Sequence, residues 1–305
     1  MSESKAEPKT FPNLSLDEFY RKCHDVFPMP FDGIKLMVNK PINSHFQVSH
    51  TLNLQSAQAG YRFGSTYVGQ PAPGSAPTEA FPVLLGDMDL NGNTSATMVH
   101  QWANGFRVKC MAQTQKSQLA GTQFSLEKRG RLTHMGLTVA NPSILTDSGT
   151  LVAQYVRRVT ENLDLGVEFV SQAAVDPTAK KGSAPVVFSV LSYGARYTTP
   201  FWTLAANVST SRLLLNYFHK QTERIQFGVE FESNLQKQET KSTVGWQIDL
   251  PDDMTFRASA DTDWVVTGVM EKKLSRQIPF TLCLSAIHNL EKNATRVGLG
   301  LIIGS

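Results

Sequence analysis

The stretch LDLGVEF at residues 163–169 decides the fold class of this chain, because apolar and polar or small side chains alternate along it without a break. Successive side chains of an extended strand point to opposite faces, so the stretch has one apolar face and one wet face. IQFGVEF at residues 225–231 repeats the same pattern. Both stretches therefore predict strands that are covered by an apolar medium on one side and by water on the other.

The alternation continues from Ile34 to the C-terminus. Turn residues of the Gly, Pro, Asn, Asp and Ser type divide this part of the chain into about nineteen segments of roughly seven to twelve residues. We expect the first strand over 34–40, the last over 295–303, and short connections in between. Segments of this length match what a tilted membrane-spanning strand needs.

So many antiparallel strands leave two unpaired edges unless the sheet closes on itself. Closure gives an all-β transmembrane barrel whose wet faces line an aqueous lumen. A soluble sandwich would divide the strands between two sheets, and no second domain or long crossover supports that division. An odd number of strands makes the first and last strands pair in parallel, which bacterial barrels avoid and the mitochondrial porin superfamily does not.

The N-terminal part differs from the rest of the chain. Residues 1–14 are polar and contain proline, which predicts a flexible arm. Residues 15–33 form a helical segment in which Ser15 and Glu18 make a capping box and Pro28 ends the pattern. Its apolar residues recur at helical spacing and are expected to pack inside the barrel, which spans 34–305; they are Leu16, Phe19, Tyr20, Cys23 and Phe27.

Composition excludes several classes of protein. The 305 residues are 41% hydrophobic and contain no run of 18 or more apolar residues, which excludes a helical membrane protein but not a barrel. The formal net charge of +3 comes from scattered Lys and Arg, so nucleic-acid binding is not expected. Three distant cysteines argue against a disulfide framework or a zinc site.

Motifs of catalytic chemistry are missing from the sequence. No GxxxxGK, HExxH or GxSxG motif occurs, so neither an enzyme nor a cofactor is expected. Asp87 and Asp89 alone are too few ligands for a metal ion, and a role in a turn is the better interpretation.

Several strings, with the spacing between them, are similar to the forty-kilodalton channel subunits of the mitochondrial TOM complex, in the mitochondrial porin superfamily. The resemblance covers the chain from about residue 15 to the end. The strings are GIKLMVNK at 33–40, HFQVSHTL at 45–52, PTEAFPVLLGDMDLNG at 77–92, GVEFES at 228–233, DTDWVVTGVMEKKL at 261–274 and GLGLIIG at 298–304.

The resemblance implies a nineteen-stranded barrel in the mitochondrial outer membrane, with the N-terminal helix in or across the lumen. It implies a channel that passes unfolded precursor proteins with basic presequences and catalyses no covalent chemistry. The implied partners are the central receptor subunit, the small single-helix subunits, membrane lipid and further copies of the pore. The short N-terminal arm departs from vertebrate members, which have a long Pro-rich extension.

Two sets of residues are candidates for function. The last strand fits the family's sorting signal at Arg296, Gly298, Leu301 and Ile303, although an ordinary amphipathic strand would look similar. If the apolar faces point to lipid, acidic side chains line the lumen and would attract basic presequences weakly at many positions; these acids are Glu127, Asp164, Glu168, Glu230, Glu232, Asp249 and Asp261. The same assumption places basic residues inside, namely Lys35, Arg62, Arg107, Lys109, Arg224, Lys241, Arg257 and Arg296.

Two other functions remain open at this point. A metabolite pore like the voltage-dependent anion channel would share the fold, but it would be expected to have a mainly basic lumen. A soluble β-rich binding module would be released from membranes by carbonate or high salt. For single acids, pairing across strands, such as Glu230 with Arg224, is the simpler interpretation of their presence.

Overall fold

A computed structural model of the chain describes residues 14–55, 59–71, 80–102, 104–116, 118–143, 148–174, 186–274 and 279–304. Residues 1–13, most of the predicted flexible arm, lie outside these ranges. The described residues form one helix and nineteen strands: α1 (Glu18–His24), β1 (Gly33–Pro41), β2 (Phe46–Leu54), β3 (Ala59–Pro71), β4 (Ala80–Asp89), β5 (Thr94–Gln101), β6 (Phe106–Gln115), β7 (Gln118–Arg129), β8 (Thr133–Ser143), β9 (Ser148–Arg158), β10 (Leu163–Ala174), β11 (Val186–Thr198), β12 (Trp202–Ser209), β13 (Arg212–Lys220), β14 (Ile225–Asn234), β15 (Glu239–Leu250), β16 (Met254–Asp261), β17 (Val265–Lys273), β18 (Phe280–Asn289) and β19 (Ala294–Ile303).

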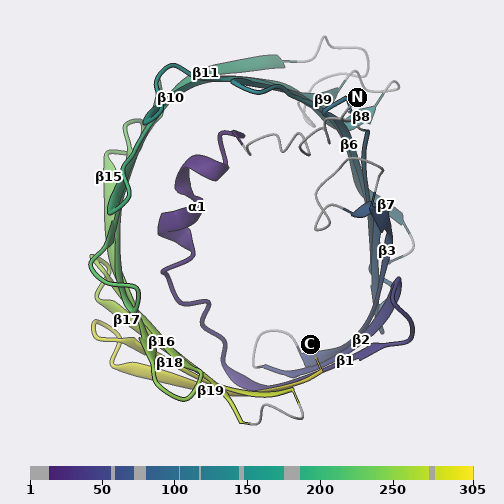
Figure 1. The fold of residues 1–305 in the computed structure, drawn as a ribbon, viewed down its shortest axis with the longest axis vertical. Coiled ribbons are helices and arrows are strands. Elements are labelled where there is room, and N and C mark those ends of the chain that lie inside the picture. Colours follow the sequence, from purple (N-terminus) through teal and green to yellow (C-terminus); the bar gives the residue numbers. More distant parts are fainter. Residues whose placement is uncertain are drawn as a thin grey trace, which may run out of the picture.

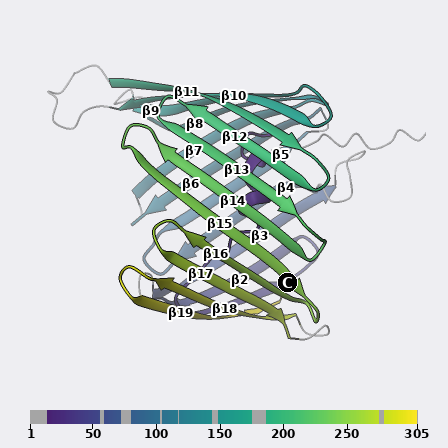
Figure 2. The same cartoon turned by 90° about the vertical axis from the view of Figure 1, so that its left-hand side faces the viewer.

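The strands form one closed barrel (Figures 1 and 2). Each strand pairs in antiparallel fashion with the next, and β1 closes the ring by pairing in parallel with β19. This seam runs from Gly33 opposite Gly298 to Val38 opposite Ile303. The prediction of a nineteen-stranded barrel with a parallel seam is confirmed, and all odd-numbered strands run toward one end of the barrel.

The pairing register shows which residues face the lumen. Residues of α1 and of the segments directly before and after it lie against Gly166, Gly194, Gly228, Gly245 and Gly298, so these glycines are on the inner face. Side chains alternate along each strand and paired residues share a face. The inner face of the whole barrel therefore follows from these five positions.

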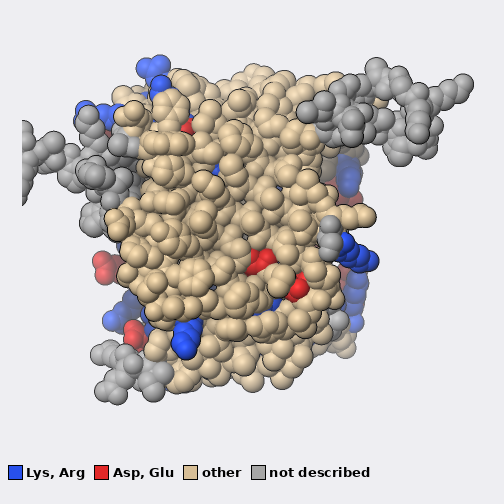
Figure 3. All heavy atoms as spheres, turned by 90° about the vertical axis from the view of Figure 1, so that its right-hand side faces the viewer, with Lys and Arg blue, Asp and Glu red and all other residues tan. Residues whose placement is uncertain are grey.

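The outer face is apolar. Large hydrophobic side chains such as Phe63, Leu137 and Phe169 are exposed on it. The wall formed around β3, β6 and β7 is largely uncharged, with Lys and Arg mainly near its margins and a few Asp or Glu atoms visible within it (Figure 3). This wall has the chemistry that contact with lipid requires.

The helix α1 lies inside the barrel, beside the wall (Figure 1). It begins at Glu18 with Asp17 as its N-cap and without a side-chain cap hydrogen bond, so the predicted capping box is wrong. Instead, Ser15 O and Leu16 O accept hydrogen bonds from the backbone N–H groups of Glu18 and Phe19, at 3.1 and 3.0 Å. Among the described residues, no helix is long and apolar enough to cross a membrane.

Candidate functional site

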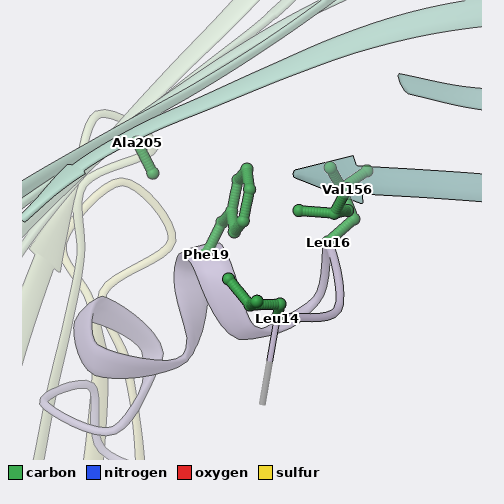
Figure 4. Packing of buried hydrophobic residues seen from close by; sticks show 5 residues of the cluster. All are labelled: Leu14, Leu16, Phe19, Val156 and Ala205. Carbon is green, nitrogen blue, oxygen red and sulfur yellow. The ribbon is translucent and has the colours of Figure 1, made fainter. Parts of the chain in front are cut away.

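Inside the lumen, an apolar cluster joins α1 to the barrel wall. Leu14, Leu16 and Phe19 pack against Val156 of β9 and Ala205 of β12, and all five residues are at most 3% exposed (Figure 4). Burying large apolar side chains of this kind stabilises a contact by about 1.5–3 kcal/mol each. The predicted lumenal helix is therefore attached firmly to one side of the pore.

Two glycines allow the segments on either side of α1 to come this close to the wall. A Cβ atom added to Gly194 of β11 would lie 2.6 Å from Leu16 Cδ1, and one added to Gly245 of β15 would lie 2.6 Å from Phe27 Cδ1. Real Cβ contacts do not occur at such distances, so larger residues at these positions would push the segment away from the wall. Phe27 itself lies beyond the end of α1, although the sequence placed it within the helical pattern.

Cys23 of α1 is buried against the barrel wall. Its side chain is 2% exposed, and its Sγ lies 3.7 Å from Tyr217 O and 3.6 Å from Val229 O. Burial, with a smaller contribution from the nearby Glu230 carboxylate, raises the pKa of the Cys23 thiol to about 12. The thiol is therefore neutral and inaccessible while α1 is docked.

A buried ionic cluster holds the N-terminal end of α1. Asp164 Oδ2 accepts hydrogen bonds from Arg196 Nη2 at 2.6 Å and Nε at 3.0 Å, and Asp164 Oδ1 accepts one from Arg158 Nε at 2.9 Å. Arg196 Nη1 also donates to Glu18 O of α1 at 3.1 Å, and its guanidinium carbon lies 4.7 Å from the centre of the Phe19 ring. Arg196 thus connects the wall to the helix.

This cluster determines what Asp164 can do. The sequence placed Asp164 on the lumenal face, and it does lie there, but its side chain is only 4% exposed and carries two arginine partners. A carboxylate in this position has no free charge to offer a passing peptide. Its contacts position α1.

Three more of the predicted acids face the lumen with basic partners. Their charges are balanced locally, as expected for ion pairs between neighbouring strands. Glu127 lies 3.5 Å from Arg129 and 3.9 Å from Arg107, Glu232 lies 2.8 Å from Arg212, and Asp261 lies 3.0 Å from Lys241.

The remaining three acids, Glu168, Glu230 and Asp249, have no Lys or Arg partner among the described residues. Glu168 accepts a hydrogen bond from Gln154 Nε2, and Asp249 accepts hydrogen bonds from Gln247 and Thr255. Glu230 accepts one from Asn216 Nδ2 at 3.0 Å and lies 3.5 Å from His24 Nε2. These carboxylates lie on β10, β14 and β15, on the side of the barrel where α1 is attached.

The predicted basic residues fall into three groups. Arg107, Lys241 and Arg257 face acidic partners, and Arg62 lies 3.2 Å from Asp87. No ion pair of the described residues includes Lys35, Lys109 or Arg296, which also face the lumen. Arg224 lies in the turn just before β14, where its carbonyl oxygen accepts a hydrogen bond from the backbone N–H of Asp249, and no ion pair of the described residues joins it to Glu230.

The four residues of the predicted sorting signal divide between the two faces of β19. Arg296 and Gly298 share the lumenal face, while Leu301 and Ile303 lie on the lipid-facing side. Gly298 lies directly under Phe31, whose carbonyl oxygen and ring would collide with any Cβ atom there. The contact with Phe31 therefore explains why residue 298 is a glycine, independently of any role in sorting.

No group of three or more His, Cys, Asp or Glu side chains that could hold a metal occurs in the described part of the chain. Asp89, singled out in the sequence, instead accepts hydrogen bonds from the backbone N–H groups of Asn91 and Asn93, at 2.8 and 2.9 Å. Its carboxylate closes the turn between β4 and β5, as the sequence suggested.

The geometry described so far is that of a closed barrel with a helix bound in its lumen. A family model described as "Eukaryotic porin" matches residues 14–298. The chain belongs to the eukaryotic porin family. This finding confirms the resemblance seen in the sequence strings and agrees with a mitochondrial outer-membrane barrel.

Similar proteins in animals share nearly the whole chain. A Caenorhabditis elegans protein named "Mitochondrial import receptor subunit TOM40 homolog" is 49% identical over 97% of this chain and 96% of its own length. A Drosophila melanogaster protein named "Mitochondrial import receptor subunit TOM40 homolog 2" is 41% identical over 99% of this chain and 87% of its own. The Homo sapiens protein named "Mitochondrial import receptor subunit TOM40 homolog" is 39% identical over 95% of this chain and 78% of its own length.

Sequence reasoning missed the role of Arg196. Alternation along residues 192–196 places Arg196 on the same face as Gly194, which was a usable signal that it points inward. The partner on α1 was not readable, because the position of the helix along the wall depends on long-range packing. His134 is a similar case: alternation places it on the inner face of β8, but its position 3.7 Å from Glu127 and its 2% exposure could not be read from the sequence.

Proposed function

We propose that this chain is the protein-conducting channel of the mitochondrial outer-membrane import translocase. The observation that carries the proposal is the combination of a closed nineteen-stranded barrel with near-full-length similarity to TOM40 homologs. The channel passes unfolded precursor proteins and catalyses no covalent chemistry.

The lumen supports a specific path for basic presequences. Glu168, Glu230 and Asp249 are partly exposed and lack Lys or Arg partners in the described part of the chain. Glu230 and Asp249 lie on the adjacent strands β14 and β15, and Glu168 lies on β10, four strands away from β14. Carboxylates in a confined aqueous pore attract cations, and weak attraction at several positions keeps transit reversible. Asp164, Glu127, Glu232 and Asp261 contribute less, because their charges are already balanced.

The proposed partners follow from this function. They are precursor proteins with basic presequences, the central receptor and small single-helix subunits of the translocase, membrane lipid, and further copies of the pore. Arg296, Gly298, Leu301 and Ile303 are proposed to be read as a sorting signal before the seam between β1 and β19 closes.

The test is single-channel current through the purified chain in a planar bilayer, with a basic amphipathic presequence peptide added. We expect a cation-preferring pore that the peptide blocks transiently and that a scrambled acidic peptide does not block. The triple variant Glu168→Gln, Glu230→Gln, Asp249→Asn removes three contacts of about 0.5 kcal/mol each, so the blocking affinity should fall about tenfold.

A matched control removes the same charge outside the lumen. Glu161, Glu223 and Asp252 are exposed in turns, and their replacement by Gln, Gln and Asn should leave the peptide block unchanged. An anion-selective pore that ignores the peptide would instead identify a metabolite channel. Equal loss of block in both triple variants would refute the acidic path, and a chain that forms no pore would refute the channel.

A further inference from the structure

By strand alternation, the outward-facing positions of the described strands carry charges of only one sign. In the described strands, alternation places every Asp and Glu on the inner face or at a strand end next to a turn, and only Lys40, Lys128, Arg157 and Lys272 among the charged residues face outward. Each is the penultimate residue of its strand, on β1, β7, β9 and β17. Because odd-numbered strands run in the same direction, all four cations lie near the same end of the barrel.

Two of these cations lie close together. Lys128 is paired with Met135 of β8, and Arg157 is paired with Thr133 of the same strand. Neighbouring strands are about 4.8 Å apart and residues two positions apart along a strand are about 6.8 Å apart, so the two Cα atoms are about 12 Å apart. Both side chains are exposed and long enough to reach one anionic group between them.

The surroundings of this pair are amphipathic. Lys128 Nζ lies 5.2 Å from the centre of the Phe106 ring, and Arg131 is exposed in the turn that joins β7 and β8. On the side toward the middle of the barrel, Met135 and Leu137 are 49% and 45% exposed on the outer face of β8. A ligand that fits must therefore join an anionic end to an apolar body.

No carboxylate on the outer face competes for these cations. Glu127, the neighbour of Lys128 in sequence, points inward toward Arg129 and Arg107. Glu161 lies in the turn after β9, beyond the strand end. In the described residues, neither Lys128 nor Arg157 takes part in an ion pair.

We propose that Lys128 and Arg157 bind the phosphate headgroup of an anionic phospholipid whose acyl chains lie over Met135 and Leu137. The proposal rests on the placement of the barrel in a membrane, where lipid must cover this wall. Cations near the interface cost little there and attract anionic lipid, whereas at the midplane they would be strongly unfavourable. The one-ended distribution of the four outward cations further predicts that the leaflet at this end is the one that supplies the lipid.

The test measures lipid retained by the full chain after reconstitution in nanodiscs of phosphatidylcholine with or without phosphatidylinositol, followed by release into detergent and native mass spectrometry. Each cation near a membrane surface contributes about a fivefold preference for anionic lipid. The double variant Lys128→Gln, Arg157→Gln should therefore bind phosphatidylinositol with an affinity about 30-fold weaker than that of the unchanged chain. Each single variant should bind phosphatidylinositol about fivefold more weakly than the unchanged chain. The single variants therefore still test the proposal if the double variant does not fold.

The control double variant is Lys116→Gln, Lys237→Gln, which removes two exposed lysines from turns at the opposite end. It should retain phosphatidylinositol normally. Channel conductance and peptide block are measured on the same samples, so that loss of the pore is distinguished from loss of the lipid site.

Three results would overturn the proposal. Equal retention in the Lys128, Arg157 variants and in the control would show that these residues do not select lipid. Displacement of the lipid by free inorganic phosphate at millimolar concentration would identify a plain anion site. Normal lipid retention combined with loss of a partner subunit from the assembled translocase would assign the cations to an acidic protein segment.

Discussion

Replacing Arg196 with methionine is expected to release α1 from the wall. Methionine keeps an apolar stem against Phe19 but removes the guanidinium that joins Asp164 to Glu18 O. Arg158 remains as a partner for Asp164, so the carboxylate is not left without a counter-charge. The change therefore acts mainly on the docking of the helix rather than on the barrel.

The size of the effect follows from the lost contacts. A hydrogen bond from a charged group contributes about 1.5–3 kcal/mol, and a cation over an aromatic ring about 0.5–1 kcal/mol. Their loss weakens docking by about 2–4 kcal/mol. Because 1.4 kcal/mol corresponds to a factor of ten, the undocked population should rise about 30- to 1,000-fold.

Cys23 supplies the assay. The docked helix buries its thiol, so a maleimide can react only when α1 leaves the wall, and the labelling rate reports the undocked fraction. The experiment is made in a background in which Cys110 and Cys283 are replaced by serine, in folded protein at pH 7.5. Arg257→Met is the control, because Arg257 faces the lumen with Gln247 and Glu271 as partners and has no contact with α1 among the described interactions.

Labelling of the Arg196→Met chain within about fivefold of the unchanged chain would refute this account of α1. The same conclusion would follow if Arg257→Met accelerated labelling as strongly, because the effect would then come from general loosening of the barrel.

Three further predictions concern packing and the buried thiol. Gly298→Ala should destabilise the barrel by about 1–3 kcal/mol, because the new Cβ meets Phe31. The unfolding temperature, followed by the change in gel mobility between folded and unfolded chain, should fall. Gly60→Ala, where a Cβ meets nothing within 4 Å, should leave the unfolding temperature unchanged. Phe19→Ala should weaken helix docking by about 3–5 kcal/mol and accelerate Cys23 labelling, and an unchanged rate would contradict the packing in Figure 4. Cys23 in the docked helix should label far more slowly than a free thiol between pH 7 and 10, because burial raises its pKa and the maleimide reaches it only when α1 leaves the wall; labelling as fast as that of a free thiol across this range would show an accessible thiol.

The barrel could be predicted from the sequence because every strand shows the same alternation of apolar and polar residues. A lipid-facing and a water-facing side force a period of two, so strands expected at 34–40 and 295–303 are found at Gly33–Pro41 and Ala294–Ile303. The inward placement of Glu127 and Glu230 followed from the same rule. Alternation does not mark where a strand ends, and Arg224 lies in the turn just before β14.

The lumenal contacts were less predictable. The capping box at Ser15 is a local signal, and it does not form in the structure. The start of the helix is set instead by the burial of Leu14 and Leu16 against residues more than a hundred positions away in sequence. Likewise, alternation shows that Asp164 and Arg196 face inward, but only the docked helix shows why they meet. Asp164, which was expected to attract presequences, therefore positions α1 through Arg196 instead.

The parallel seam between β1 and β19 makes closure of the barrel depend on both extremes of the strand order. Without β19, β1 and β18 would each be left with a bare edge in an environment that supplies no water to satisfy their backbone groups, unless these two strands paired with each other. The nineteen-stranded ring with its parallel seam therefore exists only when both β1 and β19 are in place.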